Sequence, residues 1–521
     1  TQRVLPAVPV RTYQATLARL EKPLVQPVAI PADALRGEGG VQVGLSPSLA
    51  AGLDGVRDWM RAYPYVCLEQ RVSRAVALGD PTLWNSIVAD LPSYTDSDGL
   101  LKYFPGMTMG SDVLTTYVVA IGHEAGLTIP ADAEEKLEKG LADFVAGRIM
   151  RYGPIQAADL PLRKLAAIDA LAAVGKADPA MLSSITIEPN LWPDSAVIDW
   201  WSILLRLPQV HDRGARLKEV EQIARSRMNQ QGTAMHLATN PRDDMWWLMV
   251  SPDRNMVRLA LLLLDNNLWH DDVPLVIRGA LALQSHGAWN ETVTNAWGTL
   301  AISRFTKAFE STPVSGVTSA SLQNAIKKMD WARDPSGGSI AFEWPPAGAD
   351  LRIDHAGTGV PWVEIRTLAA IPLTQPLSSG YKITRTLAPV EGQRAGAWKR
   401  GDLVRVHLKI EAQTDMTWVV VNDPIPAGAS HLGTGLSRDS EIATAGENLN
   451  PANFVWPIFS ERAFDGYRAY YEYVPKGSFE FEYTIRLNQS GVFRLPATRV
   501  EALYQPEMLG ELPNQPLEVA P

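Results

Sequence analysis

The chain has 521 residues, of which 46% are hydrophobic and 20% are charged, and its 48 basic and 57 acidic side chains give a net charge of -9. This length exceeds what one hydrophobic core supports, and the composition excludes an intrinsically disordered chain, so several folded domains are expected. Because the chain is acidic and has no cluster of basic residues, we do not expect nucleic acid as a partner.

The sequence predicts neither a membrane span nor a disulfide. Its longest apolar run, residues 256–264, is about half as long as a helix that crosses a bilayer. No basic and then apolar segment at the start resembles a signal peptide, so we expect a mature form or a fragment. Cys67 is the single cysteine and therefore forms no disulfide within the chain.

The first part of the chain is predicted to be extended and then helical. Residues 1–45 are punctuated by prolines, and helical periodicity runs from residue 48 to about residue 310. The connecting segments contain Pro, Gly, Asp and Asn, which end helices. Roughly a dozen helices with short connections predict paired helices stacked into a ring or a solenoid. The clearest helical segments are 48–78, 111–127, 162–175, 197–207, 246–267, 274–283 and 294–309.

Near residue 311 the pattern changes to short alternating runs bounded by Pro and Gly, which are typical of strands. A small β module is expected first, and the spacing of the later runs predicts a β-sandwich. The order is therefore an extended lead-in, a large α domain, a small β module and a β-sandwich. The predicted strand segments are 337–344, 351–369, 403–412, 417–428, 467–474, 479–487 and 493–504.

Cys67 opens the tetrapeptide Cys67-Leu68-Glu69-Gln70. A Cys and a Gln three residues apart can lie on one helical turn with their side chains facing each other. The thiol of Cys67 can then take the acyl carbon of Gln70 and expel ammonia, which leaves an internal thioester that acylates amines or hydroxyls. Such a pair also occurs by chance, with the Cys as a small buried hydrophobic residue. The preceding Tyr-Pro-Tyr, the helical domain and the lack of another cysteine favour the thioester.

Residues 63–70 resemble the thioester signature of the alpha-2-macroglobulin and complement superfamily, and the whole chain resembles the C-terminal third of its bacterial members. The segments 423–428 and 491–511 are similar to the last domain of those proteins. The resemblance implies an α/α-toroid thioester domain inserted in a CUB-like β domain and followed by a macroglobulin-type β-sandwich. The implied boundaries are 1–45 for the lead-in and first CUB-like part, 46–312 for the toroid, 313–378 for the second CUB-like part and 379–521 for an MG10-like sandwich.

A thioester must be kept dry until it is needed, because water hydrolyses it. Tyr63 and Tyr65 precede Cys67 by a turn or less and are candidates for apolar cover, although Tyr63 could equally be an ordinary core residue. In the bacterial proteins a Met-bearing loop of the last sandwich is thought to close the pocket. The resemblance therefore implies shielding roles for Tyr504 and Met508 as well.

Some complement proteins use a histidine of the toroid to attack the thioester. This chain has none between His123 and His211, where that residue is expected, so direct attack by lysine amines on the Gln70 acyl group is predicted. His123, His211 and His286 are expected to cap helices or to pack.

Other candidate sites are weaker. The acidic pairs 243–244 and 271–272, the second beside His270, lack metal-ligand or glycosidase spacing and are expected to be solvated loop residues. The tryptophan pairs 200–201 and 246–247 are expected to pack between helices. We therefore predict no metal and no cofactor.

The resemblance implies an endopeptidase inhibitor without turnover. A protease would cut the bait region, expose the thioester and be acylated once through a lysine amine. The bait region, the lipidated N-terminus and the upstream macroglobulin domains of the family are not within these 521 residues. A periplasmic monomer is expected, anchored in the inner membrane by that N-terminus in the full-length protein, with a peptidoglycan synthase as a conceivable envelope partner.

Two alternatives stay open. An α/α-toroid enzyme that acts on polysaccharide, with glycan-binding β modules, needs two carboxylates that converge at the mouth of the ring. An envelope scaffold with a decayed thioester needs neither carboxylates nor a reactive bond. Reactivity toward small amines separates all three.

Overall fold

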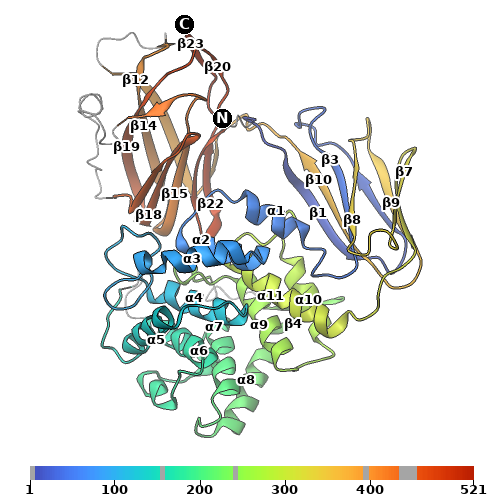
Figure 1. Cartoon of the computed structure of the whole chain (residues 1–521), viewed down its shortest axis with the longest axis vertical. Coiled ribbons are helices and arrows are strands. Elements are labelled where there is room, and N and C mark those ends of the chain that lie inside the picture. The colour runs from blue at the N-terminus through green and yellow to red at the C-terminus, as the bar shows by residue number, and fades with distance from the viewer. Residues whose placement is uncertain (1–5, 153–158, 239–243, 391–397, 433–454) are drawn as a thin grey trace. The chain divides into compact units, whose positions relative to one another are not determined.

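The computed structural model of the chain describes residues 6–152, 159–238, 244–390, 398–432 and 455–521 (Figure 1). The chain divides into two compact units, which we call the first unit (Val10–Ala369) and the second unit (Thr1–Pro9 with Ala370–Pro521). Strands at both ends of the chain flank a mainly helical part, so the prediction of a multidomain α and β protein is confirmed.

The first unit contains a β-sandwich whose strands come from two distant parts of the sequence. All pairs are antiparallel, and in each sheet strands that precede residue 47 pair with strands that follow residue 316. The helical residues are therefore inserted between two halves of one sandwich. One sheet has the order β1 (Arg11–Arg19), β10 (Trp362–Ala369), β3 (Gly40–Ser46) and β8 (Gly338–Phe342), and the other β2 (Leu24–Val28), β9 (Ala349–Ala356), β6 (Val317–Leu322) and β7 (Ala325–Asp330).

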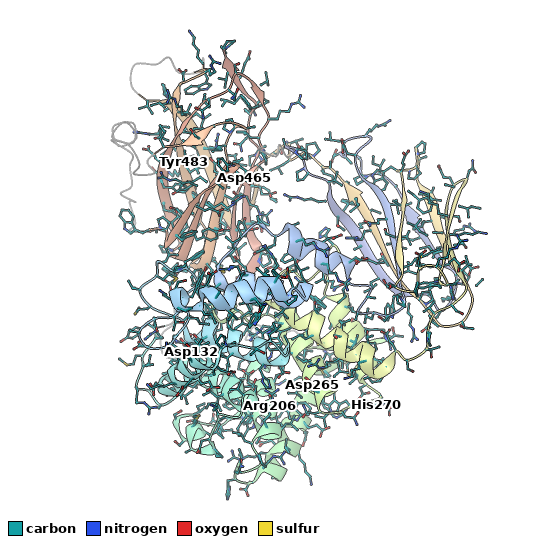
Figure 2. All side chains as sticks on the ribbon, in the orientation of Figure 1. Asp132, Arg206, Asp265, His270, Asp465 and Tyr483 are labelled. Atoms are coloured by element: carbon teal, nitrogen blue, oxygen red, sulfur yellow. The ribbon has the colours of Figure 1, made fainter. Side chains whose placement is uncertain are left out.

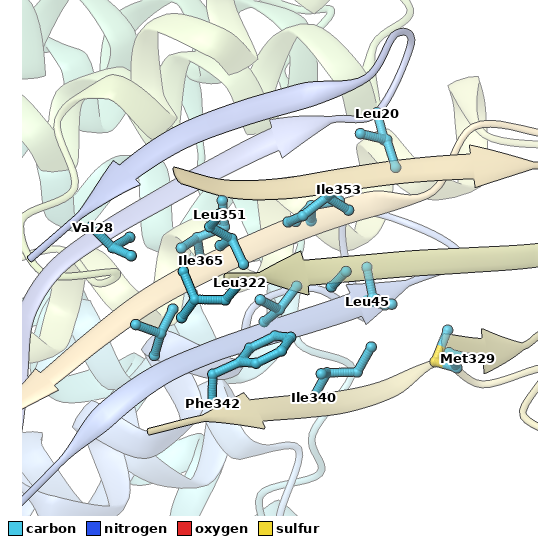
Figure 3. Close-up of a cluster of buried hydrophobic side chains, with 14 of the residues drawn as sticks. Leu20, Val28, Leu45, Leu322, Met329, Ile340, Phe342, Leu351, Ile353 and Ile365 are labelled. Atoms are coloured by element: carbon cyan, nitrogen blue, oxygen red, sulfur yellow. The ribbon is translucent and has the colours of Figure 1, made fainter. Parts of the chain in front are cut away.

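The core of this sandwich is built from aliphatic and aromatic side chains of both sheets (Figure 3). Leu45 and Ile365 come from one sheet, and Leu322 and Ile353 from the other, and each is less than 5% exposed. Alternating positions of β6 and β9 are buried, as expected for strands with one face on a core. Burial of this apolar area joins the two halves of the sandwich although about 270 residues, the mainly helical part of the chain, separate them.

Between these halves, six helices contact one another in a closed cycle, α2–α4–α6–α7–α9–α11–α2, and we call them the ring helices. The helices α1, α3, α5, α8 and α10 pack against the ring helices that neighbour them in sequence. The helix bounds are α1 Asp54–Ala62, α2 Leu68–Leu78, α3 Pro81–Tyr94, α4 Asp112–Glu124, α5 Ala131–Val145, α6 Leu160–Ala173, α7 Asp194–Arg206, α8 Arg213–Ser226, α9 Pro252–Asp265, α10 Val273–Ala282 and α11 Thr292–Phe309.

Three details of the predicted helices were wrong. The segment 48–78 is not one helix, because Pro64 cannot continue α1 and holds the preceding Tyr63 in an extended conformation. The segment 228–237 forms a hairpin of β4 (Met228–Gln231) and β5 (Ala234–Leu237), with Gly232 at positive φ in its turn. The segment 246–267 begins as a short 3-10 helix, and the left-handed Met249 separates it from α9.

The second unit is made of antiparallel sheets of six and four strands with a further three-stranded sheet. The strand β14 alternates between buried and partly exposed residues, whereas the central strand β15 is buried along almost its whole length. The six-stranded order is β11 (Leu377–Ser379), β22 (Gln505–Leu512), β21 (Thr498–Ala502), β15 (Met416–Pro424), β18 (Gly466–Val474) and β17 (Phe459–Arg462). The four-stranded order is β12 (Tyr381–Pro389), β14 (Leu403–Ala412), β19 (Gly477–Arg486) and β16 (Ser430–His431), and the third is β13 (Trp398–Lys399), β23 (Leu517–Ala520) and β20 (Gly491–Phe493).

A buried ion pair joins the two main sheets of the second unit. Asp423 is completely buried, and its carboxylate accepts two hydrogen bonds from Arg385 Nε, at 2.9 and 3.0 Å. The hydroxyls of Tyr483 and Thr498 also donate to it. The Asp423 carboxylate thus has one cationic and two hydroxyl partners, and such pairing is the condition under which a charge is tolerated in a core.

None of the helices in the described part of the chain is long and apolar enough to cross a membrane.

Candidate functional site

The structure brings Cys67 and Gln70 together at the start of α2. Cys67 is the N-cap residue, in an extended conformation (φ -64°, ψ 170°), and Gln70 is the third residue of the helix. The two form a reciprocal capping box, in which the Gln70 side-chain Oε1 accepts the Cys67 backbone N–H at 2.9 Å and the Cys67 side chain faces the Gln70 backbone N–H. Cysteine thus occupies the place that Ser or Thr usually takes in this motif.

Both side chains are shut away from water, with Cys67 0% and Gln70 1% exposed. Gln70 Nε2 has no hydrogen-bond partner among the described residues. A buried amide nitrogen in that state costs about 1–3 kcal/mol. This unsatisfied nitrogen, Gln70 Nε2, is the one that leaves as ammonia if the Cys67 sulfur attacks the amide carbon.

Burial and the negative charge of Glu69 raise the pKa of the Cys67 thiol well above its ordinary value, and the backbone N–H groups of Gln70 and Glu69 oppose that rise. The buried thiol is therefore protonated at neutral pH. A helix N-terminus favours a thiolate.

Glu69 anchors the first turn of α2 to other ring helices. Its side chain is 0% exposed, and its Oε1 accepts hydrogen bonds from Ser73 Oγ at 2.5 Å and Thr292 Oγ1 at 2.8 Å. The Tyr117 hydroxyl lies 2.6 Å from Ser73 Oγ and must donate to it, because Ser73 has one proton and gives it to Glu69. Thr292 lies on α11 and Tyr117 on α4, so this cluster joins three ring helices behind the Cys–Gln pair. No role was predicted for Glu69 from the sequence.

Tyr65 and Tyr63 lie just before the pair, as expected. Tyr65 is 1% exposed, whereas Tyr63 is half-buried, and their rings meet edge to face with centroids 5.4 Å apart. Tyr63 also packs on Trp59, at 4.8 Å, and its carbonyl accepts a hydrogen bond from Arg74. Tyr63 therefore packs on two neighbouring aromatic rings without being a fully buried core residue, and its shielding role stays a prediction.

A second cover over the start of α2 was not foreseen. The Leu68 N–H, the first of the helix, donates to the carbonyl oxygen of Tyr103 at 3.0 Å. Tyr103 and Phe104 are each 3% exposed, and the Tyr103 hydroxyl lies 3.7 Å from the sulfur of Met249. An aromatic pair followed by Pro105 was the available sequence signal.

Tyr504 and Met508 belong to the second unit. Tyr504 is buried in the turn between β21 and β22. Met508 was expected on a loop, and this was wrong, because it lies within β22, which pairs with β21. Its thioether approaches Gly380 so closely that a Cβ there would come 2.2 Å from the Met508 methyl carbon. The proposed shielding of Cys67 by these two residues stays a prediction.

The described histidines and acids form no candidate metal centre. His270 lies at the edge of the helical part (Figure 2), 65% exposed, and its neighbour Asp271 is fully exposed. Asp243 lies outside the described residues. His211 is exposed beside Asp212, and His286 Nδ1 lies 2.8 Å from Ser285 Oγ.

The tryptophan pairs differ from each other. Trp200 and Trp201 are buried, as expected for residues packed between helices. Trp247 is only partly buried, and its indole N–H donates to Asp159 at 3.1 Å.

In the part of the chain that the structure describes, one cavity inside the ring contains acids. A polar cavity of about 30 Å³ is lined by residues of α4, α6, α7, α9 and α11, among them Asp265 and Arg206 (Figure 2). That volume holds roughly one or two waters and no sugar ring. Its carboxylates pair with arginines: Glu124 with Arg206, Asp169 with Arg258 and Asp265 with Arg304.

Residues 380–507 match the family model of the bacterial alpha-2-macroglobulin MG10 domain. No curated protein sequence matches the chain. Among solved structures, native Escherichia coli alpha-2-macroglobulin from domain MG7 to the C-terminus has a TM-score of 0.74 at 19% identity, over 99% of this chain and 83% of that one. Salmonella alpha-2-macroglobulin reacted with methylamine has a TM-score of 0.73 at 20% identity, over 99% and 34%. The native conformation of E. coli alpha-2-macroglobulin has a TM-score of 0.71 at 18% identity, over 99% of this chain and 33% of that one.

These findings confirm the resemblance to bacterial alpha-2-macroglobulins, by sequence in the C-terminal domain and by fold over nearly the whole chain. At such identities the solved structures establish the fold alone. This chain spans about a third of the length of the two longer relatives, since it covers 33% and 34% of them.

Proposed function

We propose that this chain, with its MG10 domain and its alpha-2-macroglobulin fold, is the thioester-bearing C-terminal part of a bacterial alpha-2-macroglobulin that traps proteases. The observation that carries the proposal is the buried capping box of Cys67 and Gln70. The closed cycle of ring helices supports its assignment as the α/α-toroid thioester domain. The split sandwich of the first unit supports a CUB-like domain into which the toroid is inserted.

Thioester formation uses the groups of the capping box. The Cys67 sulfur forms a bond to Gln70 Cδ, the Cδ–Nε2 bond breaks, and the thiol proton leaves on the nitrogen as ammonia. The Cys67 backbone N–H, already 2.9 Å from Oε1, stabilises the negative charge that this oxygen gains in the tetrahedral intermediate. Because Nε2 has no partner among the described residues, its departure breaks no hydrogen bond seen there.

Burial protects the bond in two ways. It excludes water, and it makes the thiolate of Cys67 a poor leaving group, because a charge at this site is desolvated and lies close to Glu69. When a conformational change opens the site, the desolvation ends, while the N–H groups at the start of α2 remain to stabilise the thiolate. The site therefore acts as a two-state lock on a reactive bond.

The trapping step consumes the bond. A lysine amine of the protease attacks Gln70 Cδ, the Cδ–Sγ bond breaks, and the amine proton ends on the Cys67 sulfur. Each molecule would react once, which makes the protein an inhibitor without turnover. Bait-region cleavage as the trigger, a periplasmic location, an anchored N-terminus and a peptidoglycan synthase as partner belong to this proposal for the full-length protein.

The intact mass of the chain, before and after methylamine, tests the proposal. We expect a native mass one ammonia below that of the sequence, no free thiol, and the appearance of the Cys67 thiol as methylamine adds. The Cys67→Ala variant should take up no methylamine. A native mass equal to that of the sequence, with a free thiol from the start, would contradict the thioester in this chain.

The shielding residues give a second prediction. If Tyr63 and Met508 exclude water, Tyr63→Ala or Met508→Ala should shorten the thioester lifetime several-fold while the melting temperature changes little. The release of the Cys67 thiol in buffer, followed by thiol titration, measures that lifetime. An unchanged lifetime in both variants would remove these residues from the shield.

A further inference from the structure

The segment 95–111, between α3 and α4, lies over the first turn of α2, and we call it the cover loop. Within this loop, the carbonyl oxygen of Tyr103 accepts a hydrogen bond from the backbone N–H of Leu68, the residue that follows Cys67. Leu101 is completely buried, and its N–H donates to Thr115 Oγ1 of α4 at 2.8 Å. The cover loop is thus fixed both to the helix that carries the Cys–Gln pair and to a neighbouring ring helix.

Arg151, from the connection between α5 and α6, holds both ends of the cover loop. Its Nε donates to the Gly110 carbonyl at 2.8 Å, and one terminal nitrogen lies 2.6 Å from Asp96 Oδ2 and 2.7 Å from Asp98 Oδ2. The side chains of Arg151 and Asp96 are only 10% and 3% exposed. Because the pair is buried, loss of the arginine leaves a desolvated carboxylate in the loop.

Asp96 also folds the loop upon itself. Its Oδ1 accepts the N–H groups of Asp98 and Leu100, each at 2.9 Å, and its Oδ2 accepts that of Gly110 at 2.7 Å. Burial opposes its ionisation, but these N–H groups and Arg151 outweigh that effect and lower the pKa of Asp96. The carboxylate is therefore charged throughout the neutral range.

Arg151 is in turn tied to the ring. Its carbonyl oxygen accepts a hydrogen bond from Arg163 of α6 at 3.1 Å. Arg163 makes a two-pronged ion pair with Asp112 at the start of α4, at 2.5 and 2.9 Å, and lies 3.5 Å from Asp159. The buried charges form a continuous chain from α4 and α6, through Arg151, to the two ends of the cover loop.

We propose that Arg151 is a positioning residue for the thioester, because it latches the cover loop over the first turn of α2 and so keeps water from the bond. This inference rests on the proposed function, because the cover loop has a bond to protect only if Cys67 and Gln70 form a thioester. The latch itself lies wholly within the first unit. It therefore acts independently of any cover that other domains supply.

The test measures access to Cys67 with and without a thioester. In the otherwise unchanged chain, Arg151→Ala should shorten the thioester lifetime about tenfold or more, since it lowers the cost of local opening. In a Gln70→Ala background, which forms no thioester, the same change should raise the rate of Cys67 labelling by iodoacetamide by a similar factor. Arg151→Lys and Asp98→Asn, which keep part of the latch, should give smaller increases.

Arg227→Ala is the matched control. Arg227 likewise pairs with a buried carboxylate, Asp194 at 2.7 Å, and with the carbonyls of Pro189 and Asn190, but on α7 and its flanking segment. We expect this variant to leave labelling unchanged. Equal acceleration in both arginine variants, or none in Arg151→Ala, overturns the latch. If the chain that keeps Gln70 forms no thioester, while Cys67 labelling still depends on Arg151, the proposed function is refuted and the role of the cover loop is kept.

Discussion

Replacing Glu69 by glutamine is expected to speed the reaction of the thioester with methylamine. The glutamine keeps an oxygen that can accept from Ser73 and Thr292, but it removes the negative charge that raises the pKa of the Cys67 thiol. A lower thiol pKa makes the sulfur a better leaving group. One pKa unit corresponds to about 1.4 kcal/mol, so we expect an increase of about two- to tenfold. The rate of thiol release at fixed methylamine concentration measures it.

Glu69→Ala is expected to behave differently, because it removes the acceptor as well as the charge. The buried Thr292 hydroxyl then loses its Glu69 acceptor, at a cost of about 1–3 kcal/mol, and Ser73 keeps only its contact with the Tyr117 hydroxyl. The first turn of α2 should loosen and little thioester should form, which the native mass reports. Slower reaction of a fully formed thioester in Glu69→Gln would contradict this account and indicate that the carboxylate carries a proton for the amine.

The pairing of Cys67 with Gln70 could be predicted because the two lie on one turn, where spacing alone determines which side chains meet. The partners of Glu69 could not. Thr292 is 223 positions away on α11, and nothing in its local sequence marks it as a neighbour of α2. The same holds for the cover loop, since the contact of Tyr103 with Leu68 depends on how α3 and α4 pack.

Strand and helix periodicity predicted most elements that have one buried face, such as β14 and α10. It failed where one residue changes the backbone, as at Pro64, which divides a helical pattern into α1 and α2. It also gave no register for the split sandwich. The pairing of Leu45 with Val363 joins residues more than 300 positions apart and follows from burial of a shared core.

A series of side-chain contacts connects the centre of the ring to α2, the helix that begins at the Cys–Gln pair. Arg258 of α9 stacks over Trp297 of α11 at 5.3 Å, and the Trp297 ring meets that of Tyr117 edge to face at 6.3 Å. Tyr117 then reaches Ser73 and Glu69 of α2 through hydroxyl contacts. The position of α2 therefore depends on groups that lie well inside the ring.

Inside the ring, the positive charge of Arg258 neutralises two buried carboxylates. It pairs with Asp169 of α6 at 2.9 Å and with Asp199 of α7, and both carboxylates are less than 10% exposed. Burial raises the pKa of Asp199, and the nearby guanidinium opposes that rise. Two buried acids thus share Arg258, and its removal leaves Asp169 without this ion-pair partner and Asp199 with the electrostatic interaction of Arg254 alone.

Arg258→Met is therefore expected to destabilise the ring by about 3–5 kcal/mol, which is typical when one partner of a buried ion pair is lost. Hydrogen exchange of α6, α7 and α9 should accelerate, and the thioester lifetime should shorten because α2 is held through Trp297 and Tyr117. Adding Asp169→Asn and Asp199→Asn should restore much of the protection, since neither buried carboxylate then lacks the charge of Arg258. Arg61→Met, which breaks an exposed pair with Asp58, is the control without effect. Exchange that stays fast in the triple variant would mean that the ring needs the shape of the arginine more than its charge.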